Sequence, residues 1–235
     1  MPFSYKYQKL SDVTLAYIEK GQGEPLILLH GNGENSEYFE FQLDEFSNHF
    51  HVYAVDSRAH GKSTRGKKAL SLQQIADDLF EFMNALQIEK ANILGFSDGG
   101  NVALLFALSH QEKIIKLISD GANLDTSGVS ARFQIGVVTG HFILKLFENK
   151  SSEAKQKREI LSLMINQPNI TQKQLSTVFV PTLIMAGTKD MIKKKHTEYI
   201  AKCISESKLC FVEGGHCVAR ENPKEFNKAV LDFLL

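Results

Sequence analysis

The chain has 235 residues and carries 27 basic and 27 acidic side chains, so its formal net charge is zero. This length is enough for one large α/β domain, and the balanced charge predicts neither nucleic acid nor an anionic membrane as a partner. The sequence has no run of roughly 20 apolar residues and its first ten residues lack the pattern of a secretory signal. We therefore expect a soluble, cytoplasmic protein.

The first predicted strands, residues 4–8 and 13–21, alternate polar and apolar residues as antiparallel edge strands do. Helical segments separate most of the strands that follow, as in residues 71–86, where apolar residues recur at spacings of three and four. Alternating strands and helices predict the α/β fold class with a doubly wound, mainly parallel sheet. Continuous apolar runs, typical of strands buried on both faces, occur at residues 25–30, 51–56, 91–96, 114–121, 181–187 and 208–215.

Residues 123–177 interrupt this alternation with helical stretches and no convincing strand. We expect a helical cap there, with residues 1–122 and 178–235 forming the core. The mixed charges around Lys150 and Arg158 are typical of a solvated helix face. The insertion has more apolar residues than docking one small helix requires, and we expect some to line a pocket: Phe133, Ile135, Val137, Val138, Phe142, Ile143 and Phe147.

The stretch GFSDGG, residues 95–100, places Ser97 between a predicted strand and a predicted helix. Turn or capping residues alone would explain this composition. In this context, however, the pattern is typical of a nucleophile elbow, in which a strained turn exposes a serine hydroxyl above the sheet. The hydroxyl then needs a base, because a serine is a poor nucleophile until its proton is removed.

His216 is the best placed base among the eight histidines, since it follows the last predicted strand through two glycines. A histidine in this role needs a carboxylate to fix its tautomer. Asp190 follows the strand at residues 181–187 and is our candidate, although an aspartate there would also serve as a helix cap. Asp120 and Asp125 remain alternatives at the end of the preceding strand.

Backbone amides for a tetrahedral oxyanion are predicted in two places. The turn HGNG, residues 30–33, follows a strand and offers the N–H groups of Asn32 and Gly33. Asp98, directly after Ser97, offers a second N–H at the start of a helix. We expect the Asp98 side chain to point away from the oxyanion, because its charge would otherwise weaken the site.

The motifs and their order, HGNG, Ser97, Asp190 and His216, resemble the α/β-hydrolase fold family of serine hydrolases from about Pro25 to the end of the chain. The resemblance implies a short cap and assigns the catalytic triad to these three residues. The stretch DSRAHGKS, residues 56–63, also resembles a segment of this family. In it Asp56, Arg58 and His60 are expected to be structural.

We therefore predict a carboxylesterase-like serine hydrolase, acting on a small-molecule carboxylic ester through an acyl-enzyme. The same triad would also suit a carbon–carbon bond in a diketone, a thioester or an amide. A ligand-binding sensor with a vestigial triad is an alternative from another class. No cofactor and no metal are expected, and Cys203, Cys210 and Cys217 match neither a disulfide framework nor a zinc site. The oligomeric state stays open.

Overall fold

The computed structural model describes residues 3–235, in which eight strands form one sheet in the order β1-β2-β4-β3-β5-β6-β7-β8. The pairs β1·β2 and β2·β4 are antiparallel, and all other pairs are parallel. The predicted α/β fold with a mainly parallel sheet is therefore confirmed. The strands are β1 (Tyr5–Lys9), β2 (Thr14–Lys20), β3 (Pro25–Leu29), β4 (His51–Val55), β5 (Ala91–Phe96), β6 (Ile114–Asp120), β7 (Thr182–Gly187) and β8 (Ser207–Val212).

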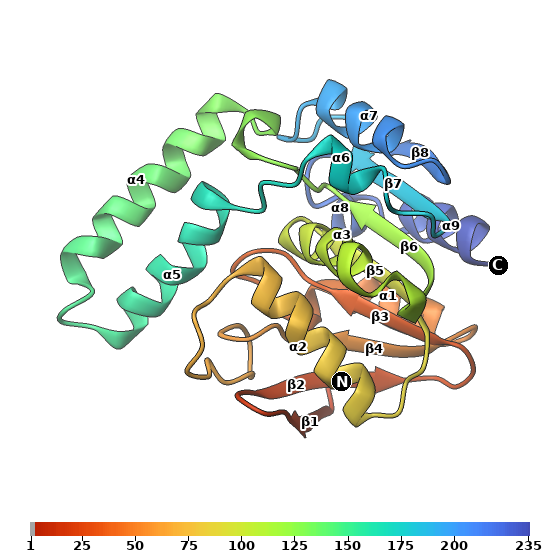
Figure 1. Cartoon of the computed structure of the whole chain (residues 1–235), viewed down its shortest axis with the longest axis horizontal. Helices are drawn as coiled ribbons and strands as arrows, with labels where there is room; N and C mark the ends of the chain where they lie inside the picture. Colours follow the sequence, from red (N-terminus) through yellow and green to blue (C-terminus); the bar gives the residue numbers. More distant parts are fainter. Residues whose placement is uncertain (1–2) are drawn as a thin grey trace.

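Helices cover both faces of the sheet (Figure 1). The side chains of each strand alternate between these two layers: in β3, Ile27 and Leu29 pack with α2, α3 and α7, whereas Leu26 and Leu28 pack with α1, α8 and α9. The central strands are thus apolar on both faces, as their sequences predict. The helices are α1 (Glu40–Phe46), α2 (Leu72–Ala85), α3 (Asp98–His110), α4 (Ala131–Phe147), α5 (Ser152–Asn166), α6 (Gln172–Leu175), α7 (Lys194–Cys203), α8 (Val218–Glu221) and α9 (Pro223–Leu234).

Between β6 and β7 the chain forms a hairpin of two long helices, α4 and α5, which projects from the core (Figure 1). Its inner helix is fastened to the core by Leu163, which is buried, by an ion pair from Glu159 to Arg65 (2.8 Å), and by a hydrogen bond from Gln156 Nε2 to the Ala59 carbonyl (2.6 Å). We call residues 131–166 the helical hairpin. No helix within residues 3–235 is long and apolar enough to cross a membrane.

Candidate active site

Ser97 lies in the sharp turn between β5 and α3, at the carboxyl edge of the sheet. Its backbone has φ 55° and ψ −118°, a strained conformation for a residue with a Cβ. Two glycines make room for the turn: a Cβ on Gly95 would lie 2.1 Å from the Gly99 carbonyl oxygen, and one on Gly99 would lie 2.1 Å from that of Leu29. The local sequence therefore forms the strained strand-to-helix turn expected from GFSDGG.

The structure brings His216 and Asp190 to this serine from two separate loops. His216 Nε2 lies 3.0 Å from Ser97 Oγ, and His216 Nδ1 lies 2.7 Å from Asp190 Oδ1. Asp190 is held in turn by the Ile192 N–H, which donates to its Oδ1 over 2.8 Å. With Nδ1 donating to the carboxylate, Nε2 is left as an acceptor for the serine hydroxyl. This arrangement can remove a proton from Ser97.

The other two candidate acids do not contact His216. Asp125 Oδ1 accepts the Ser127 N–H over 2.7 Å and caps a short 3₁₀ turn. Asp120 is fully buried, and neither of its carboxyl oxygens has a hydrogen-bond partner among the described residues. Burial, together with the nearby charge of Asp190, raises the pKa of Asp120 well above its usual range. Asp190 is thus the carboxylate that the geometry favours.

The two amides predicted for an oxyanion are the N–H groups of Asn32 and Asp98. The Asp98 N–H is at the first position of α3, where a helix provides no acceptor, and the described residues provide none for the Asn32 N–H. The HGNG turn is fixed from below by His30, whose Nε2 accepts the Ser57 N–H (3.0 Å) and whose pKa burial lowers to about 3. Both N–H groups are therefore available to a ligand.

The Asn32 side chain has a second role that its sequence position does not reveal. Asn32 Nδ2 donates to Asp98 Oδ2 (2.9 Å) and to the Ile160 carbonyl of α5 (2.8 Å). The acidic side chain after the serine is thereby held in a hydrogen bond, although burial still raises its pKa. The same amide group links the HGNG turn to the helical hairpin.

Glu34, directly after the HGNG turn, is a further residue of the site that the sequence reasoning did not identify. Its Oε2 accepts the Gly31 N–H over 3.2 Å, and it is close enough to His216 for their charges to interact. Burial raises the pKa of Glu34, which the charge of His216 only partly offsets. Its position in the sequence did not predict a role in the site, because a glutamate after a turn is usually solvated.

A cavity of about 490 Å³ begins at the HGNG turn and extends beneath the helical hairpin. Asn32, Gly33 and Glu34 form one wall, and Ser97 itself is not among the lining residues. The hairpin forms the opposite wall with four apolar and three polar side chains, namely Leu144, Ile160, Leu161 and Met164, and Glu153, Gln156 and Lys157.

Within the DSRAHGKS stretch only the turn at residues 59–61 lines this cavity. Asp56 accepts the N–H groups of Ser36 and Lys62, each over 2.7 Å. Arg58 is fully buried and pairs with Asp78 through two hydrogen bonds of 2.5 and 2.6 Å. These contacts fit the structural role expected of Asp56 and Arg58.

Metal-binding groups are not clustered in the part of the chain that the structure describes. No three His, Cys, Asp or Glu side chains of residues 3–235 converge in a way that would hold a metal ion. The three cysteines are free thiols, and burial raises the pKa of each.

The chain is similar in sequence and in fold to several known proteins. A family model described as alpha/beta hydrolase fold matches residues 24–142. The chain is 27% identical to the AB hydrolase superfamily protein YisY of Bacillus subtilis (94% of this chain and 95% of that protein) and 28% identical to the serine hydrolase BPHL of Mus musculus (96% and 84%). A crystal structure of a hydrolase from Pseudomonas aeruginosa is 25% identical and superposes with a TM-score of 0.79 over 98% of each chain.

These matches extend along nearly the whole sequence and include proteins named as hydrolases, which supports a hydrolytic function. They agree with the fold observed here, a mostly parallel sheet flanked by helices. Since the family model alone covers half of the chain, this protein belongs to the α/β-hydrolase fold family.

Proposed function

We propose that the protein is a serine hydrolase that cleaves a small carboxylic ester through an acyl-enzyme. The observation that carries the proposal is the continuous hydrogen-bonded series from Ser97 Oγ through His216 to Asp190, at 3.0 and 2.7 Å. A serine, a base and an orienting carboxylate in contact are what nucleophilic catalysis of acyl transfer requires. Membership of the α/β-hydrolase fold family supports the same chemistry.

In the first half of the reaction, His216 Nε2 takes the hydroxyl proton while Ser97 Oγ bonds to the ester carbonyl carbon. The carbonyl oxygen becomes an oxyanion and accepts the N–H groups of Asn32 and Asp98. When this tetrahedral species collapses, the carbon–oxygen bond to the alcohol breaks and Nε2 returns the proton to the leaving alkoxide. The acyl group remains on Ser97.

In the second half, water repeats the sequence. His216 Nε2 takes a proton from the water as its oxygen attacks the acyl carbon, and the proton then passes to Ser97 Oγ as the acid leaves. Asp190 keeps its hydrogen bond to Nδ1 throughout, so the imidazole holds one orientation and its charged form is stabilised. Each cycle consumes one ester and one water and yields an acid and an alcohol.

The cavity next to the HGNG turn favours a small ester with an apolar group. Its volume of about 490 Å³ lies within the range of small-molecule sites, and the apolar wall comes from the helical hairpin. We therefore propose that the hairpin acts as the cap over the site. Glu34 at the other wall disfavours a carboxylate on the substrate, because like charges repel and because Lys157, the only Lys or Arg among the lining residues, is paired with Glu153.

Two measurements test the proposal. A fluorophosphonate probe should label the wild-type protein on the peptide that contains Ser97, and Ser97→Ala should abolish the labelling. A series of p-nitrophenyl esters of increasing acyl length, run beside a thioester and a 1,3-diketone, should show the highest kcat/KM for a short or medium ester. Undiminished labelling of Ser97→Ala, or a preference for the diketone, would contradict the proposed nucleophile or the proposed bond.

A further inference from the structure

The outer side of α4 exposes a continuous row of large apolar side chains. Half of the large exposed hydrophobic side chains in the described residues lie on this one helix, each between 49% and 68% exposed. They recur at spacings of three and four, so they share one side of the helix. We call this set the α4 face: Ile135, Val138, Phe142, Ile143, Leu146 and Phe147.

Only some of the apolar side chains in residues 123–177 pack inside the molecule. Val137 is buried, and Phe133 and Val137 line a hollow between α4 and α5. The other apolar residues expected to line a pocket belong to the α4 face and point outward. An apolar patch of this kind on a soluble domain marks an interaction site.

The charges around the α4 face are positive and unbalanced. Residues 131–166 contain six basic and three acidic side chains, a net charge of +3, so the rest of the neutral chain carries −3. All three glutamates are engaged, Glu148 with Arg158, Glu153 with Lys157, and Glu159 with Arg65. Within the described residues the remaining cations have no carboxylate partner; they are Arg132, Lys145, Lys150 and Lys155.

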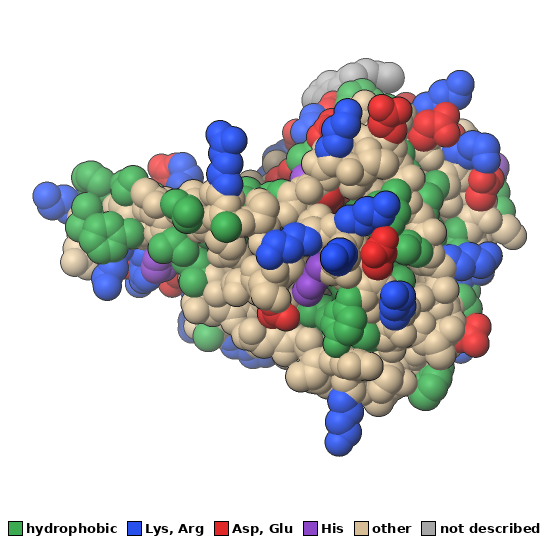
Figure 2. Space-filling model, turned by 90° about the horizontal axis from the view of Figure 1, so that it is seen from above, with side chains coloured by type: hydrophobic (Ala, Val, Ile, Leu, Met, Phe, Trp, Pro, Cys, Tyr) green, Lys and Arg blue, Asp and Glu red, His purple; other side chains and the backbone are tan. Residues whose placement is uncertain are grey.

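Figure 2 shows how these groups are arranged: hydrophobic side chains gather on the protruding end of the molecule, with basic side chains at their margin. An exposed apolar surface with Lys and Arg at its margin combines the two contributions by which a protein binds an anionic membrane, namely buried apolar area and electrostatic attraction to the headgroups. We propose that the α4 face docks onto an anionic lipid surface, with its apolar side chains among the acyl chains and the four unpaired cations at the headgroups.

A second copy of the chain is the competing occupant, and the charges disfavour it. Two α4 faces packed together would bring two hairpins of net charge +3 into contact, with Lys145 and Lys150 of each near those of the other. Like charges across an interface oppose association. An anionic lipid surface provides the opposite charge as well as an apolar phase, which satisfies both properties of the face.

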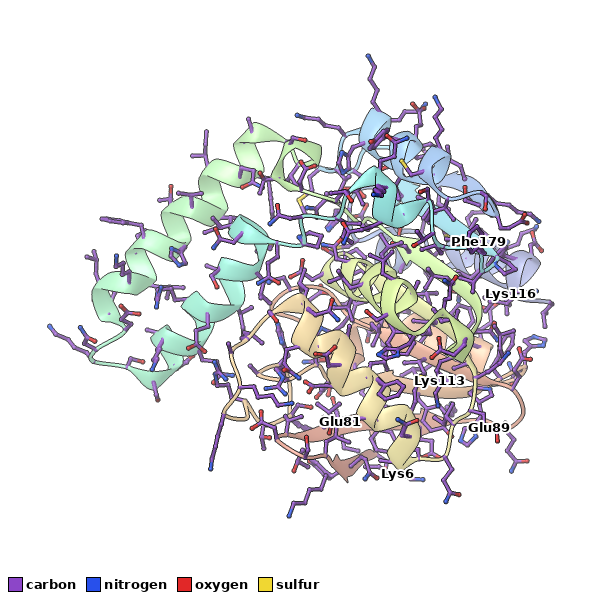
Figure 3. The ribbon with its side chains drawn as sticks, in the orientation of Figure 1. Lys6, Glu81, Glu89, Lys113, Lys116 and Phe179 are labelled. Carbon is purple, nitrogen blue, oxygen red and sulfur yellow. The ribbon has the colours of Figure 1, made fainter. Side chains whose placement is uncertain are left out.

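The test is co-sedimentation with vesicles of phosphatidylcholine alone or with about one third phosphatidylserine. The wild-type protein should bind the anionic vesicles, and less so when salt is raised from about 0.1 M to about 1 M. The double variant Phe142→Ser, Leu146→Ser should bind at least about tenfold more weakly, because two apolar side chains no longer enter the lipid. Figure 3 places Phe179, an exposed phenylalanine, on the core away from the hairpin, so Phe179→Ser is the matched control and should bind as wild type.

The charge component has its own matched pair of variants. The double variant Lys145→Gln, Lys150→Gln should weaken binding to anionic vesicles about tenfold. The control double variant Lys90→Gln, Lys202→Gln changes two exposed lysines outside the helical hairpin and should leave the binding unchanged. Ser97→Ala should bind as wild type, so the outcome is independent of the proposed hydrolysis. Binding that is absent in wild type, or equal in Phe142→Ser, Leu146→Ser, would overturn the proposal. So would a wild-type dimer that this double variant dissociates, since the face would then belong to a second copy.

Discussion

The turn around Ser97 and the outer side of α4 differ in which side chains they bury and which they expose. Around the serine, polar side chains that are partly or fully buried are hydrogen-bonded to one another: His216 contacts both Ser97 and Asp190, and Asn32 contacts Asp98. On α4, apolar groups are exposed and contact nothing on their outer side. Burying a polar group costs free energy unless it is hydrogen-bonded, and exposing an apolar patch costs free energy unless something covers it. The first region is complete within one chain, whereas the second requires a partner.

The largest effect is expected from substitution of Asp190, the carboxylate that contacts His216. Asp190→Asn should lower kcat by up to about 10⁴, because an amide beside Nδ1 favours the wrong imidazole tautomer. Asp125→Asn should retain near-wild-type kcat, since Asp125 only caps a turn. Measuring kcat and Tm for both, with Asp120→Asn alongside, tests the assignment. Normal turnover in Asp190→Asn, with collapse in one of the others at unchanged Tm, would transfer the role to that residue.

The inner and outer sides of the helical hairpin can be compared by making the same substitution at one leucine on each side. Leu163 on α5 is 1% exposed and Leu146 on α4 is 63% exposed. Leu163→Ala should lower the unfolding free energy by about 2 to 5 kcal/mol through lost burial and a cavity. Leu146→Ala should change it by less than about 0.5 kcal/mol. Chemical denaturation monitored by circular dichroism measures both, and equal losses would show that the α4 face packs against the protein itself.

The next prediction concerns the side-chain amide of Asn32, which joins the HGNG turn to α5. Asn32→Ala keeps the backbone N–H but removes the partner of Asp98 Oδ2, leaving a buried carboxylate without that hydrogen bond beside the developing oxyanion. We expect kcat to fall about tenfold. Adding Asp98→Asn should restore part of the loss, because a neutral side chain does not repel an oxyanion. A double-mutant cycle on kcat measures this coupling, and strictly additive effects would contradict it.

The smallest expected effect concerns Asp120 and stability. Its pKa is raised in the folded protein by burial and by Asp190, so folding favours the protonated form. The stability that this group contributes is present below the unfolded pKa of about 3.9 and is lost as pH rises through the folded pKa. The Tm of Asp120→Asn relative to wild type should therefore increase from pH 4 toward alkaline pH. A constant difference across pH would show that Asp120 is ionised in both states.

Local sequence determined the parts of this protein that depend on neighbours in the chain. Strand and helix character follows from apolar periodicity, and the strained turn at Ser97 follows from glycines two and three residues away, so both were predictable. His216 and Asp190 were predictable because the carboxyl ends of parallel strands meet at one edge of a sheet. The sequence favoured Asp190 but left Asp120, the last residue of the neighbouring strand, as an alternative, and the distance between His216 and Asp190 is what the three-dimensional structure adds.

Tertiary structure alone decided what each side chain meets. The contact between Asn32 and Asp98 spans 66 positions, and the one between Asn32 and Ile160 spans 128, so no local pattern encodes either. Glu34 became part of the site only when the fold buried it beside His216. The α4 sequence is apolar around much of its circumference, and only packing against α5 showed which part is covered. A net charge of zero predicted no field, because a sum over the chain carries no information about position. The excess of three positive charges can be counted in residues 131–166 of the sequence, but only the fold shows that this segment projects from the core.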